Sequence, residues 1–434
     1  MMPYLLNLVY FAAIVAASPW LFWSAVRKGK YREGLGAKLL GLVPWRTGNR
    51  PCIWLHAVSA GEVNVLKPLI EHLRHDFPHC ECVISTTTRT GYEIAKKKFS
   101  DLTVFYCPLD FSWSVRTALR RIRPDLLVLA ELELWPNLIR EAHERGTFVA
   151  VVNGRLSERS ARGYGRIRKF VRPLLRCIDL IAVQSEEYAQ RFIDLGADRS
   201  VVQVTGSMKF DGAQMNRSNE TTNQLRQLAG ISDQDVVFLA GSTQSPEEQL
   251  AIETYRSLKD EFSNLRLVLV PRHPERFAEV AQLLERSGLP WQRRSELETS
   301  RNEGAHILLV DSMGELSAWW GCAQIGFVGG SMGKRGGQSM IEPAAYGVAT
   351  SFGPNTRNFR DVVQLMLRRE AAVVVEEGTG LTAFVESCLR NRDYMRVLGS
   401  RAQKLVSDQL GATAKSTALL SWLLPDAKSQ RRAA

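Results

Sequence analysis

The feature that most constrains the fold is a regular alternation of short apolar runs with amphipathic stretches between residues 50 and 210. The apolar runs have the length of buried strands and lie at residues 52–58, 81–86, 103–106, 125–130, 148–152, 179–183 and 201–205. Helical patterns separate them, for example at 63–75, 90–99, 112–122 and 136–145. Strands that alternate with helices predict an α/β unit with a parallel, doubly wound sheet.

A second α/β unit follows a polar stretch without periodicity at 211–224. Its apolar runs lie at residues 236–240, 265–270, 306–310, 323–328, 348–351 and 372–375. A chain of 434 residues is longer than one hydrophobic core usually fills, so we predict two Rossmann-like halves joined by a hinge. Right-handed crossovers then bring the carboxyl ends of both sets of strands to a central cleft, where open α/β sheets bind ligands.

The predicted boundaries divide the chain into five segments. They are an anchor with a basic flank at 1–32, an N-terminal Rossmann-like domain at 33–212, a linker at 213–232, a C-terminal Rossmann-like domain at 233–408, and a C-terminal helix and tail at 409–434.

The N-terminal segment has the pattern of a membrane anchor, because its first 26 residues carry no charged side chain. As a helix, the stretch from Tyr4 to Val26 is about 34 Å long, enough to cross the hydrocarbon core of a bilayer. Four basic residues follow at once: Arg27, Lys28, Lys30 and Arg32. The positive-inside rule therefore predicts a retained anchor with the body of the protein in the cytoplasm. An interfacial helix is the alternative, because three residues interrupt the apolar stretch: Asn7, Ser18 and Pro19.

Composition narrows the class of partner. A hydrophobic content of 45% and a charged content of 23% are typical of a folded globular protein. The net charge of +11 favours an anionic partner, and nucleic acid, anionic lipid and a phosphorylated substrate all qualify. The seven cysteines are odd in number and mostly scattered, which favours a reducing compartment over a disulfide framework.

The step Ser59-Ala60-Gly61-Glu62 lies between the first apolar run and the first helical pattern. This arrangement places the carboxylate of Glu62 near a helix N-terminus, at the carboxyl end of a strand. A carboxylate there is either a partner of the helix dipole or a general base. Position alone leaves both interpretations open.

Two further sites in the first half carry charge beside a strand end. Glu131 and Glu133 lie one residue apart, directly after the strand at 125–130. Each acid alone is explained equally by helix capping or by an arginine partner. Lys209 follows the last strand, beside the predicted hinge, where it is either a partner for an anion or a solvated side chain. The carboxyl ends of parallel strands share one sheet edge, so we expect Glu62 and the acid pair to converge.

The second half carries the pattern of a nucleotide pocket in four segments after strands. Small residues at 240–243 expose backbone N–H groups at a helix start, and Arg272 follows the next strand, suited to bidentate contact with phosphate. Residues 311–315 begin another helix. A basic, glycine-rich loop at 329–337 precedes Glu342, whose carboxylate suits a nucleotide ribose. Each segment alone is also compatible with ordinary turn chemistry.

Two other clusters are weaker. Histidines and cysteines have spacings that a zinc site uses, but without a clear open coordination geometry: His72, His75, His79, Cys80 and Cys82. The cationic run from Arg162 to Arg176 lacks most of the aromatic residues that single-stranded nucleic acid requires. It is either a solvated helix face or, beside an anchor, a surface for phosphorylated lipid.

Taken together, the motifs resemble those of the 3-deoxy-D-manno-octulosonic acid (Kdo) transferases, inner-membrane enzymes of lipopolysaccharide core assembly. The matching segments run in order along essentially the whole chain: His56 to Glu62, Glu133 to Leu138, Asn153 to Ser157, Val204 to Asp211, Val270 to Phe277, Met313 to Leu316 and Phe327 to Ser331. The resemblance implies a GT-B fold with an acceptor-binding and a donor-binding domain. It also implies an inverting transfer of Kdo from CMP-Kdo to a lipid A precursor of the lipid IVA type, without a metal cofactor and without nucleic acid.

The resemblance also implies roles for individual residues. Glu62 matches the general base, and Glu131 and Lys209 match positions that stabilise the transition state. The positions that match CMP contacts are Pro271, Arg272, Met313, Gly314, Glu315, Ser339, Met340, Ile341 and Glu342. The chain departs from the family pattern at 338–342, which usually reads His-Asn-Pro-Leu-Glu, and at Gln244, which is often His.

Three alternatives are compatible with parts of the pattern. One is another GT-B transferase, or an epimerase, acting on a different nucleotide sugar. The second is a non-catalytic, membrane-tethered module that binds anionic lipid. A hydride-transfer Rossmann enzyme is disfavoured, because no G-x-G-x-x-G motif follows a strand with a downstream acidic residue.

Overall fold

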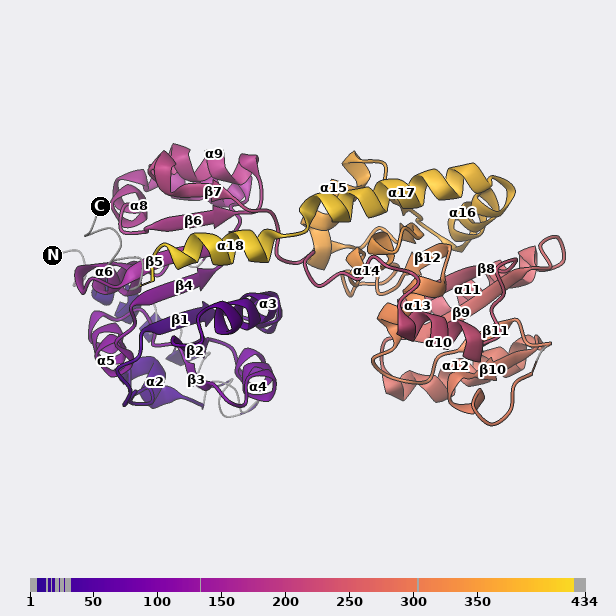
Figure 1. Ribbon diagram of the computed structural model, residues 1–434, viewed down its shortest axis with the longest axis horizontal. Coiled ribbons are helices and arrows are strands. Elements are labelled where there is room, and N and C mark those ends of the chain that lie inside the picture. The colour runs from indigo at the N-terminus through magenta and orange to yellow at the C-terminus, as the bar shows by residue number, and fades with distance from the viewer. Residues whose placement is uncertain are drawn as a thin grey trace. The chain divides into compact units, whose positions relative to one another are not determined.

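The computed structural model describes residues 6–12, 15–16, 18–19, 23, 27, 33–132, 134–302 and 304–424. The chain forms two compact units. The first comprises residues 1–212 and 410–434, and the second comprises residues 213–409. Each unit is an α/β sandwich built on its own parallel sheet of seven strands (Figure 1).

The first sheet has the strand order β3-β2-β1-β4-β5-β6-β7, and all its neighbouring strands are parallel. Its strands are β1 (Cys52–Ala57), β2 (Glu81–Thr86), β3 (Thr103–Tyr106), β4 (Leu126–Ala130), β5 (Phe148–Gly154), β6 (Leu180–Val183) and β7 (Val202–Val204). The order reverses between β1 and β4, so this unit has the topological switch point at which open α/β sheets bind ligands.

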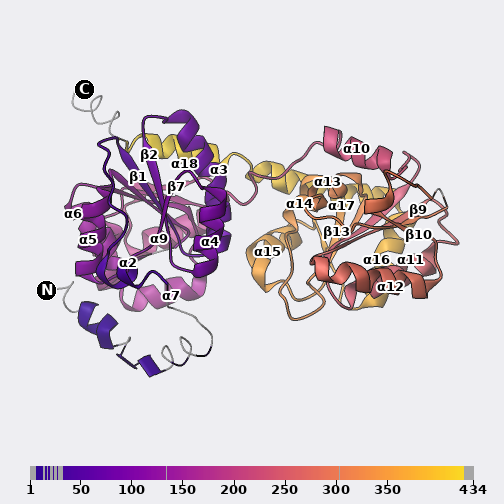
Figure 2. The same ribbon diagram turned by 90° about the horizontal axis from the view of Figure 1, so that it is seen from below.

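Helices cover both faces of the first sheet (Figure 2). One face packs against α2 (Leu35–Leu40), α5 (Ser112–Ile122), α6 (Pro136–Glu144), α8 (Arg168–Leu175) and α9 (Glu186–Leu195). The opposite face packs against α3 (Ala60–Asp76), α4 (Arg89–Lys98) and the last helix of the chain, α18 (Ala412–Ser421). The short helix α7 (Glu158–Arg166) lies beside α8 and α9. Burial on both faces explains why these strands read as continuous apolar runs.

The second sheet has the order β10-β11-β9-β8-β12-β13-β14 and is also parallel throughout. Its strands are β8 (Val236–Thr243), β9 (Leu265–Pro271), β10 (Trp291–Arg293), β11 (Ile307–Leu309), β12 (Ile325–Val328), β13 (Ala349–Phe352) and β14 (Val373–Val374). The sequence predicted each of these except β10, a three-residue edge strand with a polar centre. The switch point lies between β8 and β12.

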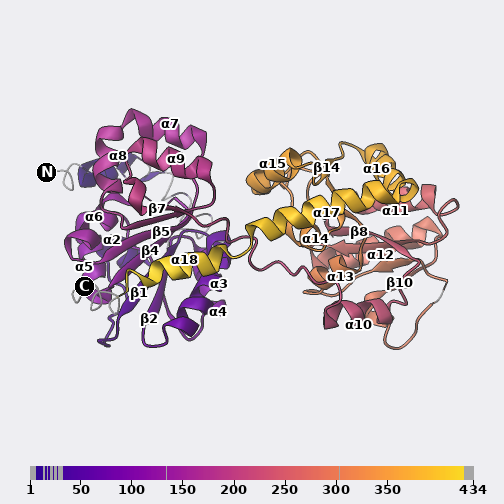
Figure 3. The same ribbon diagram turned by 45° about the horizontal axis from the view of Figure 1, so that its top comes forward.

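Helices flank the second sheet on both sides (Figure 3). They are α10 (Glu220–Leu228), α11 (Glu247–Leu258), α12 (Phe277–Ser287), α13 (Leu316–Cys322), α14 (Ile341–Ala345), α15 (Arg360–Arg368), α16 (Gly378–Arg390) and α17 (Arg392–Gln409). The core on one face is formed with α11, α12 and α16. On the other side α13 packs against α10 and α14. The stretch 213–232, expected as a linker, therefore contains a helix that belongs to the second unit.

Most of the expected N-terminal anchor, and the C-terminal tail from residue 425, lie outside the described residues. Within the described part of the chain, no helix combines the length and the apolar character needed to span a bilayer. The described residues at 6–12 are helical and are bonded to the first unit. The Asn7 amide bonds both the hydroxyl and the backbone N–H of Ser112, and Tyr10 donates to Asp110 at 3.0 Å.

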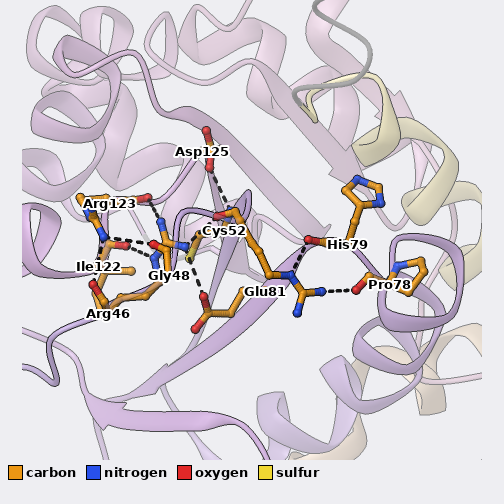
Figure 4. A network of polar contacts seen from close by, with 10 residues as sticks. Arg46, Gly48, Cys52, Pro78, His79, Glu81, Ile122, Arg123 and Asp125 are labelled. Carbon is orange, nitrogen blue, oxygen red and sulfur yellow. Dashed lines mark hydrogen bonds and ion pairs between the residues drawn. The ribbon is translucent and has the colours of Figure 1, made fainter.

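A network of polar contacts closes the amino edge of the first sheet (Figure 4). The buried guanidinium of Arg46 donates to the carbonyls of Ile122 and Arg123 at 2.6 and 3.0 Å, and it lies 3.2 Å from Glu81. Arg123 returns a bond to the carbonyl of Arg46. The Asp125 carboxylate accepts the first N–H of β1, that of Cys52. These bonds fix the segment before β1 to the edge of the sheet.

Candidate active site

Glu62 lies in the first turn of α3, immediately after the carboxyl end of β1. Its side chain is half-buried and bonds its own turn: Val58 N–H donates to Oε2 and Ser59 Oγ donates to Oε1, each at 2.8 Å. Ser59 in turn caps the helix by accepting the N–H of Glu62. This is a capping box, so the capping role of Glu62 is real. It orients the carboxylate without using all of its acceptor capacity, since an ionised carboxylate offers about four lone-pair sites.

The pKa of Glu62 and the charge near it are not explained by helix capping alone. Burial raises the pKa of Glu62 above its ordinary value, against the lowering effect of the bonds from Ser59 and Val58. The negative charge of Glu131 raises this pKa further, which shows that the two carboxylates share one electrostatic environment. A carboxyl group with a raised pKa beside a second acid is typical of general-base sites.

Glu131 follows β4 directly and has a left-handed backbone, with φ of 56°. Its backbone N–H extends the ladder to Val152, and its side chain lies between two cations. Arg155 approaches Oε2 at 3.3 Å, and Lys209 approaches Oε1 at 3.4 Å. The structure therefore brings Glu131 and Lys209 together. Glu133, the other acid of the predicted pair, lies outside the described residues.

Asn153 is a member of this edge to which the sequence analysis assigned no role. It is fully buried at the end of β5, with φ of 53°. Its Oδ1 accepts the N–H of Met208 at 3.1 Å, which fixes the loop that carries Lys209. Within the part of the chain that the structure describes, its Nδ2 has no hydrogen-bond partner. Two residues beyond Lys209, Asp211 accepts the N–H groups of Gly411 and Ala412 at the start of α18.

His56, on β1, is buried beneath the same edge. Its Nδ1 lies 2.8 Å from Ser85 Oγ, and its ring meets the Trp135 ring edge to face. No described residue bonds its Nε2. Burial lowers the pKa of His56 to about 4, so the ring is neutral at physiological pH. His56 is therefore a neutral, buried support of the edge rather than a cation in it.

In the second unit, three of the four predicted nucleotide segments follow β9, β11 and β12 at one sheet edge. The fourth, at 240–243, forms the end of β8 itself, so its small residues are part of the strand and not of a helix start. Arg272 follows β9 and is anchored by its N–H to the carbonyl of Thr243 at 3.0 Å. Glu342, in α14, is half-buried, and burial raises its pKa while the charge of Arg272 lowers it. The arginine and the carboxylate that the sequence assigned to phosphate and ribose thus lie close enough to interact.

The other residues predicted to contact CMP differ in whether their side chains are free to bind a ligand. Glu315 is saturated: Arg294 bonds both of its oxygens at 2.9 and 3.0 Å, and Ser312 donates at 2.7 Å. These bonds lower the pKa of Glu315 against the effect of burial. The exposed Met313 and Gly314, with φ of 94°, instead present backbone beside it. Met340 and Ile341 are buried core side chains, whereas Ser339 is half-buried.

The glycine-rich loop after β12 is held by one buried carboxylate. Glu247, at the start of α11, accepts the N–H groups of Gln244, Gly330, Ser331 and Met332 at 2.7–2.9 Å. Beside it lies a pocket of about 300 Å³, whose polar lining includes Gln244, His273, Arg276, Lys334 and Arg335. Its lining adds cationic side chains and backbone from three strand ends, which suits an anionic ligand.

The histidine and cysteine cluster does not form a metal site in the described part of the chain. There, no group of three or more histidines, cysteines or acids is arranged to hold a metal ion. His75 pairs with its neighbour Asp76, and Cys80 and Cys82 are buried. The cationic run lies on α7 and α8, with exposed Ile167 and Phe170 among its arginines.

Comparison with known proteins places this chain in a family. The model of the 3-deoxy-D-manno-octulosonic-acid transferase (kdotransferase) family matches residues 32–212. A 3-deoxy-D-manno-octulosonic acid transferase of Haemophilus influenzae is 34% identical over 404 residues, which are 91% of this chain and 92% of that protein. The chain belongs to the Kdo transferase family. It is therefore a glycosyltransferase. The Kdo transferase of Bordetella pertussis is 32% identical over 86% of this chain and 87% of that protein.

Solved structures support the fold of this Kdo transferase family member. The UDP-GlcNAc 2-epimerase of Neisseria meningitidis, solved with UDP-GlcNAc, matches with a TM-score of 0.55 and 13% identity. The match covers 85% of this chain and 99% of that one. A glycosyltransferase of Rickettsia africae matches with a TM-score of 0.53 and 12% identity over 87% of this chain. These likenesses confirm a GT-B fold, and a fold of this kind hosts several activities.

Proposed function

We propose that this Kdo transferase family member moves Kdo from CMP-Kdo to a lipid A precursor of the lipid IVA type, with inversion at the sugar. Glu62 is the general base that accepts the proton of the attacking acceptor hydroxyl. The observation that carries this proposal is the environment of Glu62, a carboxylate that is oriented by two hydrogen bonds and whose pKa is raised by burial. A base whose pKa lies closer to the working pH accepts a proton more effectively.

Glu131 and Lys209 supply the electrostatic part of the reaction. Negative charge develops on the departing CMP as the bond to Kdo breaks, and positive charge develops on the sugar ring. Lys209 stabilises the first and the carboxylate of Glu131 the second. Their mutual contact at 3.4 Å, with Arg155 on the other oxygen of Glu131, holds both groups ready without rearrangement.

The second unit binds the nucleotide of the donor through the edge described above. Pro271 and Arg272, the turn from Met313 to Glu315, and the segment from Ser339 to Glu342 form the CMP site. In this proposal Glu342 accepts ribose hydroxyls and Arg272 meets the phosphate. Met340 and Ile341 contribute backbone, because their side chains are buried. We propose that no metal ion takes part, so EDTA is expected to leave the rate unchanged.

The lipid acceptor implies a membrane location, and we propose the inner membrane with the catalytic units on the cytoplasmic side. Apolar side chains of the first unit support contact with anionic lipid. Leu8 and Phe11 are exposed beside Trp113 and Arg116, with which they line a common groove.

The test is to incubate the purified full chain with CMP-Kdo and a tetraacylated lipid A precursor. We expect release of CMP and a gain of Kdo mass on the acceptor by mass spectrometry. The proposal would be contradicted if no CMP were released and the acceptor gained no mass. Epimerisation of a UDP-sugar by the same preparation would also contradict it. The number of mass increments gives the number of Kdo units added.

A further inference from the structure

A second pocket in the donor-binding unit lies between the loops that follow β12 and β13. Its volume is about 370 Å³, within the usual range for ligand sites. The lining residues are Lys334, Gly336, Pro354, Asn355, Thr356, Arg357 and Arg360. Three of these are cations and none is acidic. The residues that the family resemblance assigns to CMP do not line this pocket.

The three cations stand out among the basic residues of the second unit. In the part of the chain that the structure describes, Lys334, Arg357 and Arg360 form no ion pair, whereas nine other arginines of the second unit pair with an acid. Three like charges around one pocket repel each other, and a bound anion removes that cost. Arginine is particularly suited to a carboxylate or phosphate, because its planar fork donates two parallel bonds.

The walls of the pocket are fixed by bonds between the two loops. Asn355 N–H donates to the carbonyl of Ser331 at 2.9 Å, and Asn358 N–H donates to the carbonyl of Gly336 at the same distance. Gly336 has φ of 96°, and a Cβ there would lie 2.6 Å from Cγ of Arg357. The stem of Arg357 therefore lies directly against the glycine, which limits the positions its guanidinium can adopt. Such preorganisation reduces the entropy lost when a ligand binds.

The pocket adjoins the one beside Glu247, because Lys334 lines both. The proposed donor carries two anionic groups, a phosphodiester on the cytidine side and the carboxylate of the sugar acid. We propose that the pocket of Lys334, Arg357 and Arg360 binds the carboxylate of the transferred sugar acid, while the CMP site holds the phosphate. This proposal rests on the proposed function. It makes Arg357 and Arg360 the residues that select an acidic sugar over a neutral one.

The test compares Arg357→Gln and Arg360→Gln, singly and together, in the full chain. CMP carries the phosphate but no sugar, so its Kd, measured by calorimetry, reports the nucleotide site and the fold. We expect the double variant to raise the KM for CMP-Kdo at least tenfold while the Kd for CMP changes less than twofold. Arg368→Gln is the matched control, because it removes the same charge from α15, the helix that carries Arg360, and does not line the pocket.

The remaining outcomes distinguish the sources of the anion. A rise in the KM for the lipid acceptor alone assigns the pocket to an acceptor phosphate and overturns the proposal. If the affinity for CMP falls as much as the affinity for CMP-Kdo, the pocket binds the donor phosphate. If the KM for CMP-Kdo and the Kd for CMP both stay unchanged, the arginines are ordinary surface residues. Either result also overturns the proposal. If the wild-type chain binds neither CMP nor CMP-Kdo, the proposed function itself has failed, which is a separate result.

Discussion

The two edges of the first sheet use polar side chains in opposite ways. At the amino edge, Arg46 and Asp125 form hydrogen bonds with backbone groups that have no partner within the strands and helices. At the carboxyl edge, Glu131 and Lys209 pair with each other, and the amide nitrogen of Asn153 has no hydrogen-bond partner among the described residues. The side chains of the amino edge complete the hydrogen bonding of the fold. Those of the carboxyl edge leave charged and polar groups available for a ligand.

The backbone does not separate the two edges. Glu131 and Asn153, at the ends of adjacent strands, have left-handed conformations, and so does Arg123 in the amino-edge network, with φ of 51°. For residues other than glycine this conformation costs roughly 1–3 kcal/mol, and it persists where the surroundings or the function require it. The difference therefore lies in the side chains: substitutions at the carboxyl edge should change catalysis, and substitutions at the amino edge should change stability. Three predictions test this separation.

The largest effect is expected for Glu62→Gln. The amide cannot take a proton from the acceptor hydroxyl, so we expect kcat to fall by about 10²–10⁴, the usual contribution of a general base. Gln retains an oxygen that can accept one of the bonds from Val58 or Ser59, so the melting temperature should change little. Steady-state turnover and thermal unfolding measure the two quantities. Turnover like that of the wild type would remove Glu62 from the mechanism.

The converse effect is expected for Arg46→Met at the amino edge. The substitution leaves the carbonyls of Ile122 and Arg123 without their donor and the Glu81 carboxylate without its cation. We expect a loss of about 2–4 kcal/mol in the free energy of unfolding, measured with urea, and an unchanged kcat in the folded fraction. Arg50→Met is the matched control on the same edge, because Arg50 is exposed. A large fall in kcat for Arg46→Met would contradict the assignment of stability to the amino edge and of catalysis to the carboxyl edge.

The sequence predicted the strands well, because burial on both faces makes each of them a continuous apolar run with recognisable ends. It also predicted that Glu62 and Glu131 lie at one edge, since both follow strands of one parallel sheet. Asn153, Arg357 and Arg360 were not assigned roles for a shared reason. Their significance depends on partners that the fold brings from distant segments, such as Met208 and Gly336. No local pattern at 353–360 signals a pocket.

The smallest expected effect is a shift in the pH dependence of kcat/KM. In the wild type, kcat/KM should fall on the acid side as Glu62 is protonated, with a midpoint above the ordinary carboxyl value of 4.5, because burial and then the charge of Glu131 raise this pKa. Glu131→Gln removes one negative charge, so the carboxylate of Glu62 becomes easier to form and the acid limb should move to lower pH.

The control for the pH experiment comes from the other edge. Arg46 does not contribute to the pKa of Glu62, so Arg46→Met should leave the midpoint unchanged below its unfolding temperature. The height of the profile will fall in Glu131→Gln for the separate reason that Lys209 loses its partner, and the position of the limb is therefore the quantity to compare. An acid limb that stays in place, or moves to higher pH, would show that Glu131 does not act on the base through its charge.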